Sequence, residues 1–149
     1  MPARRRSRIR ALQILYQWEL RRQLLAEDDP VEESISAYYG SLFTIETRNE
    51  EPEAPMEKDE FMEELVRGTV AHLEEIDPLA ELHSSNWRLE RMAAVDRNLL
   101  RLAIYEMKWA GTPPAVVIDE ALELAKRFSG EDSARFLNGV LDAVRQRIA

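Results

Sequence analysis

Cysteine is absent from the 149 residues, which excludes disulfide bonds and thiolate metal sites. Glycine and proline are scarce, with five and seven residues, which argues against a β fold with many turns. No apolar run approaches the roughly 18 residues of a membrane span, and no apolar region of a signal peptide follows the basic N-terminus. We therefore expect a cytoplasmic protein with no membrane partner.

Sequence motifs of enzymes are absent as well. There is no glycine-rich phosphate loop, no dinucleotide fingerprint and no serine in the context of an activated nucleophile. Histidine occurs only at His72 and His83, and His72 with Glu75 one turn later supplies fewer ligands than a metal site needs. We expect no catalytic activity, no cofactor and no bound metal.

The abundance of alanine, leucine, glutamate and arginine favours helices, and 45% hydrophobic residues suffice to build a core. Apolar residues recur at helical spacing, and no strand pattern interrupts them. We expect an all-α fold of about seven helices in one domain that spans residues 1–149. The expected helices cover about 7–25, 29–43, 59–76, a short segment after Pro78, 93–110, 115–128 and 131–148.

Local signals place the ends of several helices. Asp29-Pro30 starts the second helix, and Asp77-Pro78 ends the third and caps the fourth. Gly130 stops the sixth helix, and Asp132 or Ser133 caps the last one.

The first helix is apolar over a wide arc, which is typical of a helix buried between neighbours. Its polar side chains share one narrow sector, which holds Arg6, Arg10, Gln13, Gln17 and Arg21. Apolar side chains occupy most of the remaining circumference: Ile9, Leu12, Ile14, Leu15, Tyr16, Trp18 and Leu20.

The net charge is −8, but the charges are distributed unevenly along the sequence. Residues 1–22 hold seven arginines and one acid, whereas residues 27–64 hold fourteen acids and two basic residues. An acidic protein with a basic terminus is expected to bind a polyanion at that terminus alone. Residues 44–58 lack apolar periodicity and contain two prolines, so we expect them to form an exposed acidic loop.

The N-terminal arginines Arg4, Arg5, Arg6, Arg8 and Arg10 form the clearest candidate site. Guanidinium groups pair bidentately with phosphates and stack on bases, and arginine-rich segments can order on RNA. The alternative is a disordered solubilising tail, but these arginines run without a linker into a helix that is expected to be buried. Arginines alone do not distinguish RNA from DNA or from an acidic protein.

The segment 130–139 is a second candidate, although a purely structural role explains most of it. Phe136 lies at the edge of the apolar stripe of the last helix, where its ring faces either the core or a base. Gly139 within that helix costs about 1 kcal/mol relative to alanine, so we expect another helix to pack closely against it.

Three separate segments resemble the NusB family and occur in that family's order. The run RRRSRIRALQILYQW at 4–18 resembles its arginine-rich opening and first helix. The run VDRNLLRLAIYEM at 95–107 resembles its central helix. VIDEALELAKRF at 117–128, followed by EDSARFLNGVLD at 131–142, resembles its C-terminal signature.

The resemblance implies two small helical bundles that share the first helix. It further implies that the protein binds the boxA element of ribosomal RNA transcripts together with NusE, a small-subunit ribosomal protein, in an antitermination complex on RNA polymerase. The residues that would contact RNA by this resemblance are Arg4, Arg5, Arg6, Arg8, Tyr16, Asp132, Arg135 and Phe136.

Two other functions stay open at this point. A related helical domain is fused to ribosomal RNA cytosine methyltransferases, but a chain that ends at Ala149 has no room for a catalytic domain, so we expect the stand-alone factor. The other is a helical interaction module whose arginines bind an acidic protein partner or lie in a homodimer interface. Some members of the family form dimers that cover the RNA site.

Overall fold

The computed structural model of the chain describes residues 3–25, 31–48, 58–83 and 88–148. All regular structure in these ranges is helical, which confirms the all-α expectation. None of the described helices combines the length and the apolar character that crossing a membrane requires. The helices are α1 (Ala3–Leu25), α2 (Val31–Arg48), α3 (Glu60–Ala71), α4 (Leu73–His83), α5 (Ala94–Lys108), α6 (Pro114–Phe128), α7 (Glu131–Ile148) and the short 3-10 helix η1 (Leu89–Arg91).

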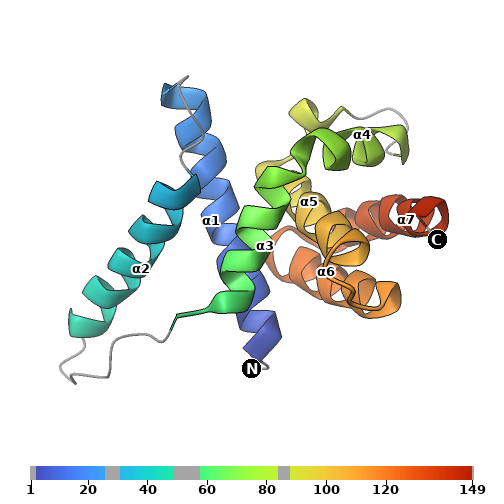
Figure 1. Cartoon of the computed structure of the whole chain (residues 1–149). Helices are drawn as coiled ribbons and strands as arrows, with labels where there is room; N and C mark the ends of the chain where they lie inside the picture. The colour runs from blue at the N-terminus through green and yellow to red at the C-terminus, as the bar shows by residue number, and fades with distance from the viewer. Residues whose placement is uncertain (1–2, 26–30, 49–57, 84–87, 149) are drawn as a thin grey trace.

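The helices pack in two groups that meet along α1, α3 and α5. In one group α1 packs against α2 and α3, and in the other α5 packs against α4, α6 and α7. Both α1 and α3 also pack against α5, and Figure 1 shows α3 lying across α1 with α5, α6 and α7 to one side. This arrangement confirms the expectation of two packed bundles that share the first helix.

Helix α5 is central because it is covered on nearly all sides. Every residue from Asn98 to Met107 is buried. Two of these buried residues, Arg101 and Glu106, are charged, so each needs a partner of opposite charge inside the fold. Helix α7 has the one-sided apolar stripe that its sequence predicts, formed by Ala134, Leu137, Val140, Leu141 and Val144.

The boundary between α3 and α4 lies at His72, so the prediction that Asp77-Pro78 separates these helices is wrong. The His72 N–H donates to the Gly68 carbonyl at 3.1 Å, which closes α3. Pro78 lies inside α4. The Asp77 carboxylate does not cap a helix but accepts two hydrogen bonds from Arg101, of 2.9 and 3.0 Å, which tie α4 to α5.

Gly130 ends α6 as its sequence position predicts. Its N–H donates to the Ala125 carbonyl at 2.8 Å, and its φ of 127° favours glycine. Helix α7 begins at the next residue, and the Gly130 carbonyl accepts a hydrogen bond from Ala134. Asp132 and Ser133 therefore lie within the first turn of α7, and the expectation that one of them caps it is wrong.

Helix α2 extends to Arg48, so residues 44–48 of the expected acidic loop are helical instead. Residues 49–57 and the expected start of α2 at Asp29-Pro30 lie outside the described residues. The helix start near residue 59 is confirmed, because the Asp59 carboxylate accepts a hydrogen bond from the Met62 N–H at 3.0 Å and caps α3.

The glycine that a close approach requires is Gly68, not Gly139. A Cβ at Gly139 would meet no atom within 4 Å, so the expected close packing there is wrong. A Cβ at Gly68 would lie 2.1 Å from Cζ of Tyr105, whose residue is only 7% exposed and whose ring stacks with His72. Any larger residue at position 68 would have to displace that ring, so Gly68 sets the spacing between α3 and α5.

Helix α1 begins at Ala3, so the N-terminal arginines lie on the helix rather than before it. Its buried side is narrower than the sequence predicts, because Tyr16 and Leu20 are 42% and 44% exposed. Glu19, in contrast, is only 9% exposed and faces α5. The exposed side of α1 is therefore partly apolar.

Candidate nucleic-acid interface

The arginines at the start of α1 point in different directions, since successive residues of a helix lie about 100° apart. Arg4 and Arg6 are exposed, Arg5 is half-buried, and Arg8 is buried. The run of arginines in the sequence therefore does not form one continuous cationic surface. Its members separate into two groups, one that faces solvent and one that binds carboxylates of the fold.

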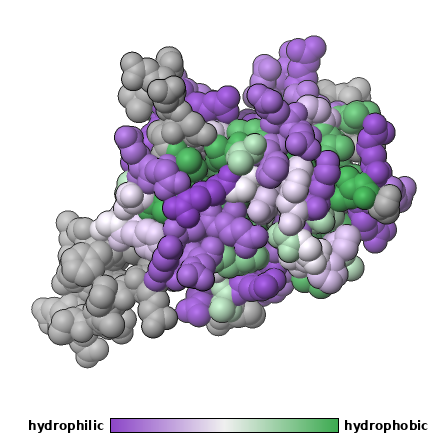
Figure 2. Space-filling model, in the orientation of Figure 1, coloured by the Kyte–Doolittle hydropathy of each residue, from purple (hydrophilic) through white to green (hydrophobic). Residues whose placement is uncertain are grey.

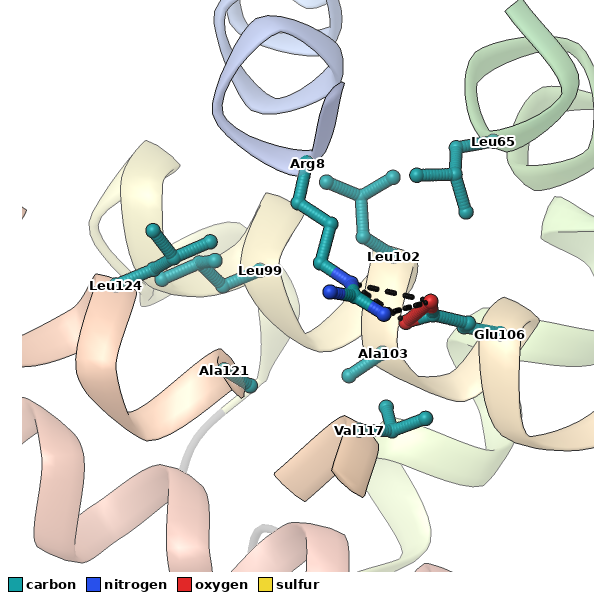
Figure 3. A pocket seen from close by; sticks show the side chains of 9 residues that line it. All are labelled: Arg8, Leu65, Leu99, Leu102, Ala103, Glu106, Val117, Ala121 and Leu124. Atoms are coloured by element: carbon teal, nitrogen blue, oxygen red, sulfur yellow. Dashed lines mark hydrogen bonds and ion pairs between the residues drawn. The ribbon is translucent and has the colours of Figure 1, made fainter. Parts of the chain in front are cut away.

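Arg8 points into the core and binds Glu106 of α5. Its Nη2 lies 2.6 Å from Oε1 of Glu106, and its Nε lies 3.1 Å from each carboxylate oxygen. The two residues are 8% and 3% exposed. Figure 3 shows this pair beside a small cavity of about 20 Å³, enclosed by apolar side chains of α3, α5 and α6. Arg8 has no free face toward solvent, so an RNA contact by Arg8 stays a prediction that this geometry does not favour.

Arg5 forms a bidentate ion pair with Glu120 of α6. Its Nε and Nη2 lie 2.8 and 2.9 Å from the two carboxylate oxygens. The hydrogen bonds from Arg5 hold the pKa of Glu120 below its ordinary value, so the carboxylate stays charged at neutral pH. The Arg5 side chain is still 33% exposed, and a phosphate would have to compete with Glu120 for it.

Arg4 and Arg6 are the two predicted arginines of α1 that face solvent. The guanidinium of Arg4 lies over the ring of Phe61, 4.7 Å from its centroid, and both arginines line a cleft between the starts of α1 and α3. On the face shown in Figure 2, hydrophilic side chains cover the crossing of α1 and α3. Of the predicted arginines, these two are best placed to reach a polyanion without breaking an existing ion pair.

Tyr16 lies further along α1 in a groove of about 550 Å³ between α1, α2, the start of α5 and the end of α6. The groove has aromatic walls, since Tyr38 and the 41% exposed Phe128 also line it. Gln13 and Gln17 add amide groups that can donate and accept hydrogen bonds. Exposed rings beside amides suit unstacked bases, which bind by stacking and by hydrogen bonds to their edges.

Asp132 and Phe136 line a second hollow, of about 350 Å³, at the start of α7. Phe136 is half-buried and packs against the core, so its ring is shared between the interior and this hollow. Arg135 is exposed and donates a hydrogen bond of 2.6 Å to Asp132. The Asp96 carboxylate stands beside them and accepts hydrogen bonds of 2.9 and 3.0 Å from Ser129 and Ser133.

The cleft and the groove follow one another along α1, and the groove and the hollow are lined by neighbouring residues at the start of α5. Arg6 and Arg10 line the cleft, and Ile9 and Gln13, one turn further along α1, line the groove. The groove also includes Val95, whose neighbour Asp96 lines the hollow. We call these three sites together the surface track. The structure thus brings Arg4, Arg6, Tyr16, Asp132 and Phe136 to one track and leaves Arg8 beneath it.

Several residues of the track were not predicted from the sequence. Tyr38, Asp96, Phe128, Lys58 and Phe61 come from four other elements or their flanks and were read as core, helix or loop. Their side chains reach the track only through packing between distant segments. The one available signal was the resemblance at 95–107 and 117–128, which marks the segments but not which side chains are exposed.

The chain is similar over nearly its whole length to known proteins. The model of the NusB family matches residues 5–146. The transcription antitermination protein NusB of Solibacter usitatus is 54% identical over 99% of this chain and 92% of its own length. The protein of the same name from Myxococcus xanthus is 46% identical over 97% of this chain and 95% of its own length.

Two solved structures are similar over almost the whole chain. The NusB of T. maritima superposes with a TM-score of 0.75 and 33% identity, covering 100% of this chain and 94% of that one. A structure of the antitermination factors NusB and NusE in complex with double-stranded RNA superposes with a TM-score of 0.74 and 29% identity. That match covers 99% of this chain and 98% of the other.

Proposed function

Because the chain belongs to the NusB family of transcription antitermination proteins, we propose that it binds RNA that contains boxA through the surface track, with boxA in the groove, and does so together with NusE. The observation that carries the RNA part is the track itself: exposed Arg4 and Arg6 lead directly into a groove walled by aromatic rings. Cations neutralise phosphates, and rings bind bases that are free of a duplex. This combination favours single-stranded RNA.

The partners of the complex are proposed from the relatives. One structure similar to this chain holds NusB with NusE and RNA, which supports a NusE-like ribosomal protein as partner here. We further propose that the assembled factor joins RNA polymerase during ribosomal RNA transcription and catalyses no reaction itself. Its role is to bind and hold partners, which requires surfaces rather than a reactive group. A homodimer through the same track is the alternative, because two copies would cover the groove.

The test is a titration of boxA RNA and of a scrambled RNA of equal length, each with and without NusE. We expect boxA to bind more tightly than the scrambled RNA, and NusE to raise the affinity for boxA. Equal affinities for the two RNAs would contradict boxA recognition. A different result would be that the protein forms a dimer at high concentration and binds RNA only after this dimer dissociates. That result would favour a homodimer as the form of the protein in the absence of RNA.

Tyr16→Leu is expected to weaken boxA binding by about 1–3 kcal/mol, since leucine fills the groove but offers no ring for stacking. The melting temperature should change little because Tyr16 is 42% exposed. Leu24→Ala is the control, since Leu24 is 82% exposed on the same helix and lies outside the groove lining. If Tyr16→Leu binds boxA as tightly as the unchanged protein, the RNA does not use the groove.

A further inference from the structure

The cleft between the starts of α1 and α3 has the chemistry of a nucleotide site that the predicted residues do not explain. It has a volume of about 490 Å³ and is lined on one side by α1 and on the other by Lys58, Asp59, Glu60 and Phe61. Lys58 was expected to belong to an acidic loop, and Phe61 was expected only as part of a helix. The cleft instead presents both beside Arg4 and Arg6.

The net charge of the cleft is positive because its most buried acid is already neutralised. The Asp59 carboxylate accepts hydrogen bonds from the Ser7 hydroxyl at 2.8 and 2.9 Å, from Arg10 at 3.0 Å and from the Met62 N–H at 3.0 Å. Asp59 therefore closes the floor of the cleft and is not available to repel an anion.

The remaining cations of the cleft are free to bind. Among the residues that the structure describes, Arg4, Arg6 and Lys58 have no carboxylate within ion-pair distance, and all three are exposed. Glu60, also exposed, is the one acid of the lining that opposes them. Three unpaired cations and one carboxylate give the cleft an excess of positive charge, which favours binding of a phosphate.

Phe61 adds a feature that a plain phosphate site would not need. The Arg4 guanidinium lies over its ring, 4.7 Å from the centroid, so the ring covers one side of the guanidinium. Guanidinium planes stack on bases as well as on rings. Phe61 is therefore a positioning residue for Arg4, which can hold a base on its other face while Lys58 and Arg6 meet the adjoining phosphate.

We propose that this cleft binds one nucleotide of the RNA that lies outside the boxA element, with Lys58 and Arg6 on its phosphate and Arg4, positioned by Phe61, against its base. The inference rests on the proposed function, because Arg6 connects the cleft to the groove that would hold boxA. RNA fits better than a small anion, since the cleft offers a guanidinium for stacking and the groove is lined by residues one turn further along α1.

The experiment compares a minimal boxA RNA with RNAs extended by a few nucleotides at the 5′ or the 3′ end. The unchanged protein is expected to bind one of the extended RNAs more tightly than the minimal one. Lys58→Gln should remove that gain: near 0.1 M salt its affinity for the extended RNA falls about fivefold, and the slope of log K against log salt becomes shallower by about 0.7. Its affinity for the minimal RNA should not change.

Two further variants and one control sharpen the test. Glu60→Gln removes the opposing carboxylate and is expected to strengthen binding of the extended RNA. Phe61→Leu keeps an apolar side chain but no longer positions Arg4, so it should lower the affinity for the extended RNA. The slope of log K against log salt should change little, because Lys58 still contacts the phosphate. Arg145→Gln removes one positive charge at the far end of α7, remote from the start of α1 in Figure 1, and should change none of these values.

The outcomes separate this inference from the proposed function. If the minimal boxA RNA binds but Lys58→Gln leaves every affinity and slope unchanged, the cleft inference is overturned and the proposed function stands. If Arg145→Gln weakens binding as much as Lys58→Gln, the effect is one of overall charge and the cleft is again excluded. If the unchanged protein binds no boxA RNA, the proposed function itself fails.

Discussion

Replacing Glu106 with alanine is expected to lower the free energy of unfolding by about 3–5 kcal/mol, because the change leaves the Arg8 guanidinium buried without a counter-charge. Glu106 is 3% exposed, and it also accepts a hydrogen bond of 3.4 Å from Thr112. No second acid replaces it fully, since Glu120 lies 3.9 Å from Nη1 of Arg8 and is already bound to Arg5. Denaturant unfolding of the two proteins at neutral pH measures the loss.

The matched control removes both charges at once. Arg8→Met with Glu106→Leu replaces the buried ion pair by apolar side chains of similar length, which is often neutral or stabilising. We expect this double variant to be far more stable than Glu106→Ala alone. If the double variant is as unstable as the single one, the pair matters through its shape and not through an unpaired charge, and the explanation above is wrong.

Glu19→Ala is expected to cost about 3 kcal/mol of stability, near the lower end for breaking a buried ion pair. The Glu19 carboxylate binds two arginines of α5: it forms a short ion pair with Arg97 and accepts from Nη1 of Arg101 at 2.5 Å. Both arginines keep other partners, Arg101 with Asp77 and Arg97 with two backbone carbonyls, which limits the loss. Glu123→Ala, at an exposed pair with Lys126, should cost less than about 1 kcal/mol.

The Glu19 interaction also carries a predictable dependence on pH. Burial of the carboxylate would raise its pKa, but the hydrogen bonds from Arg97 and Arg101 outweigh burial and hold the pKa below its ordinary value of 4.5. A lowered folded-state pKa gives stability that is complete above the unfolded-state pKa and is lost as pH falls through the folded-state value. The stability gap between the unchanged protein and Glu19→Gln should therefore narrow only below about pH 4.5. A gap that narrows between pH 8 and pH 6 instead would contradict this assignment.

The sequence was sufficient to predict those helix ends and apolar faces that depend on nearby residues of the same helix. Asp59 caps α3 and Gly130 ends α6, as their residue types and positions predict. Helix α7 buries the one-sided apolar stripe that its sequence predicts. For Asp59 and Gly130 the deciding interactions lie within one or two turns of the residue.

Predictions failed where distant contacts decide the outcome. Pro78 signals a helix end, but the adjacent Asp77 is bound by Arg101 from another helix, and α4 continues through it. Gly68 is required by the Tyr105 ring, which lies 37 positions further along the sequence. Neither contact can be predicted from the residues that neighbour it in the sequence.

The same limit applies to the candidate site. The sequence places four arginines side by side, and the resemblance assigns RNA contacts to all of them. Their partition depends on carboxylates far along the chain: Arg8 pairs with Glu106, 98 positions away, and Arg5 with Glu120, 115 positions away. The sequence gives the charge of these arginines, but the carboxylates that neutralise Arg5 and Arg8 come close to them only in the folded chain.

The central claim is that the exposed arginines, not the buried one, bind RNA, and the salt dependence of the affinity for boxA RNA extended by a few nucleotides tests it most directly. Two stable double variants are compared with the unchanged protein: Arg4→Gln with Arg6→Gln, and Arg8→Met with Glu106→Leu. The first should flatten the slope of log K against log salt by about 0.7, from the one phosphate contact that Arg6 makes, and the second should leave it unchanged. A slope that flattens in the Arg8 variant and stays the same in the Arg4 and Arg6 variant would contradict the account.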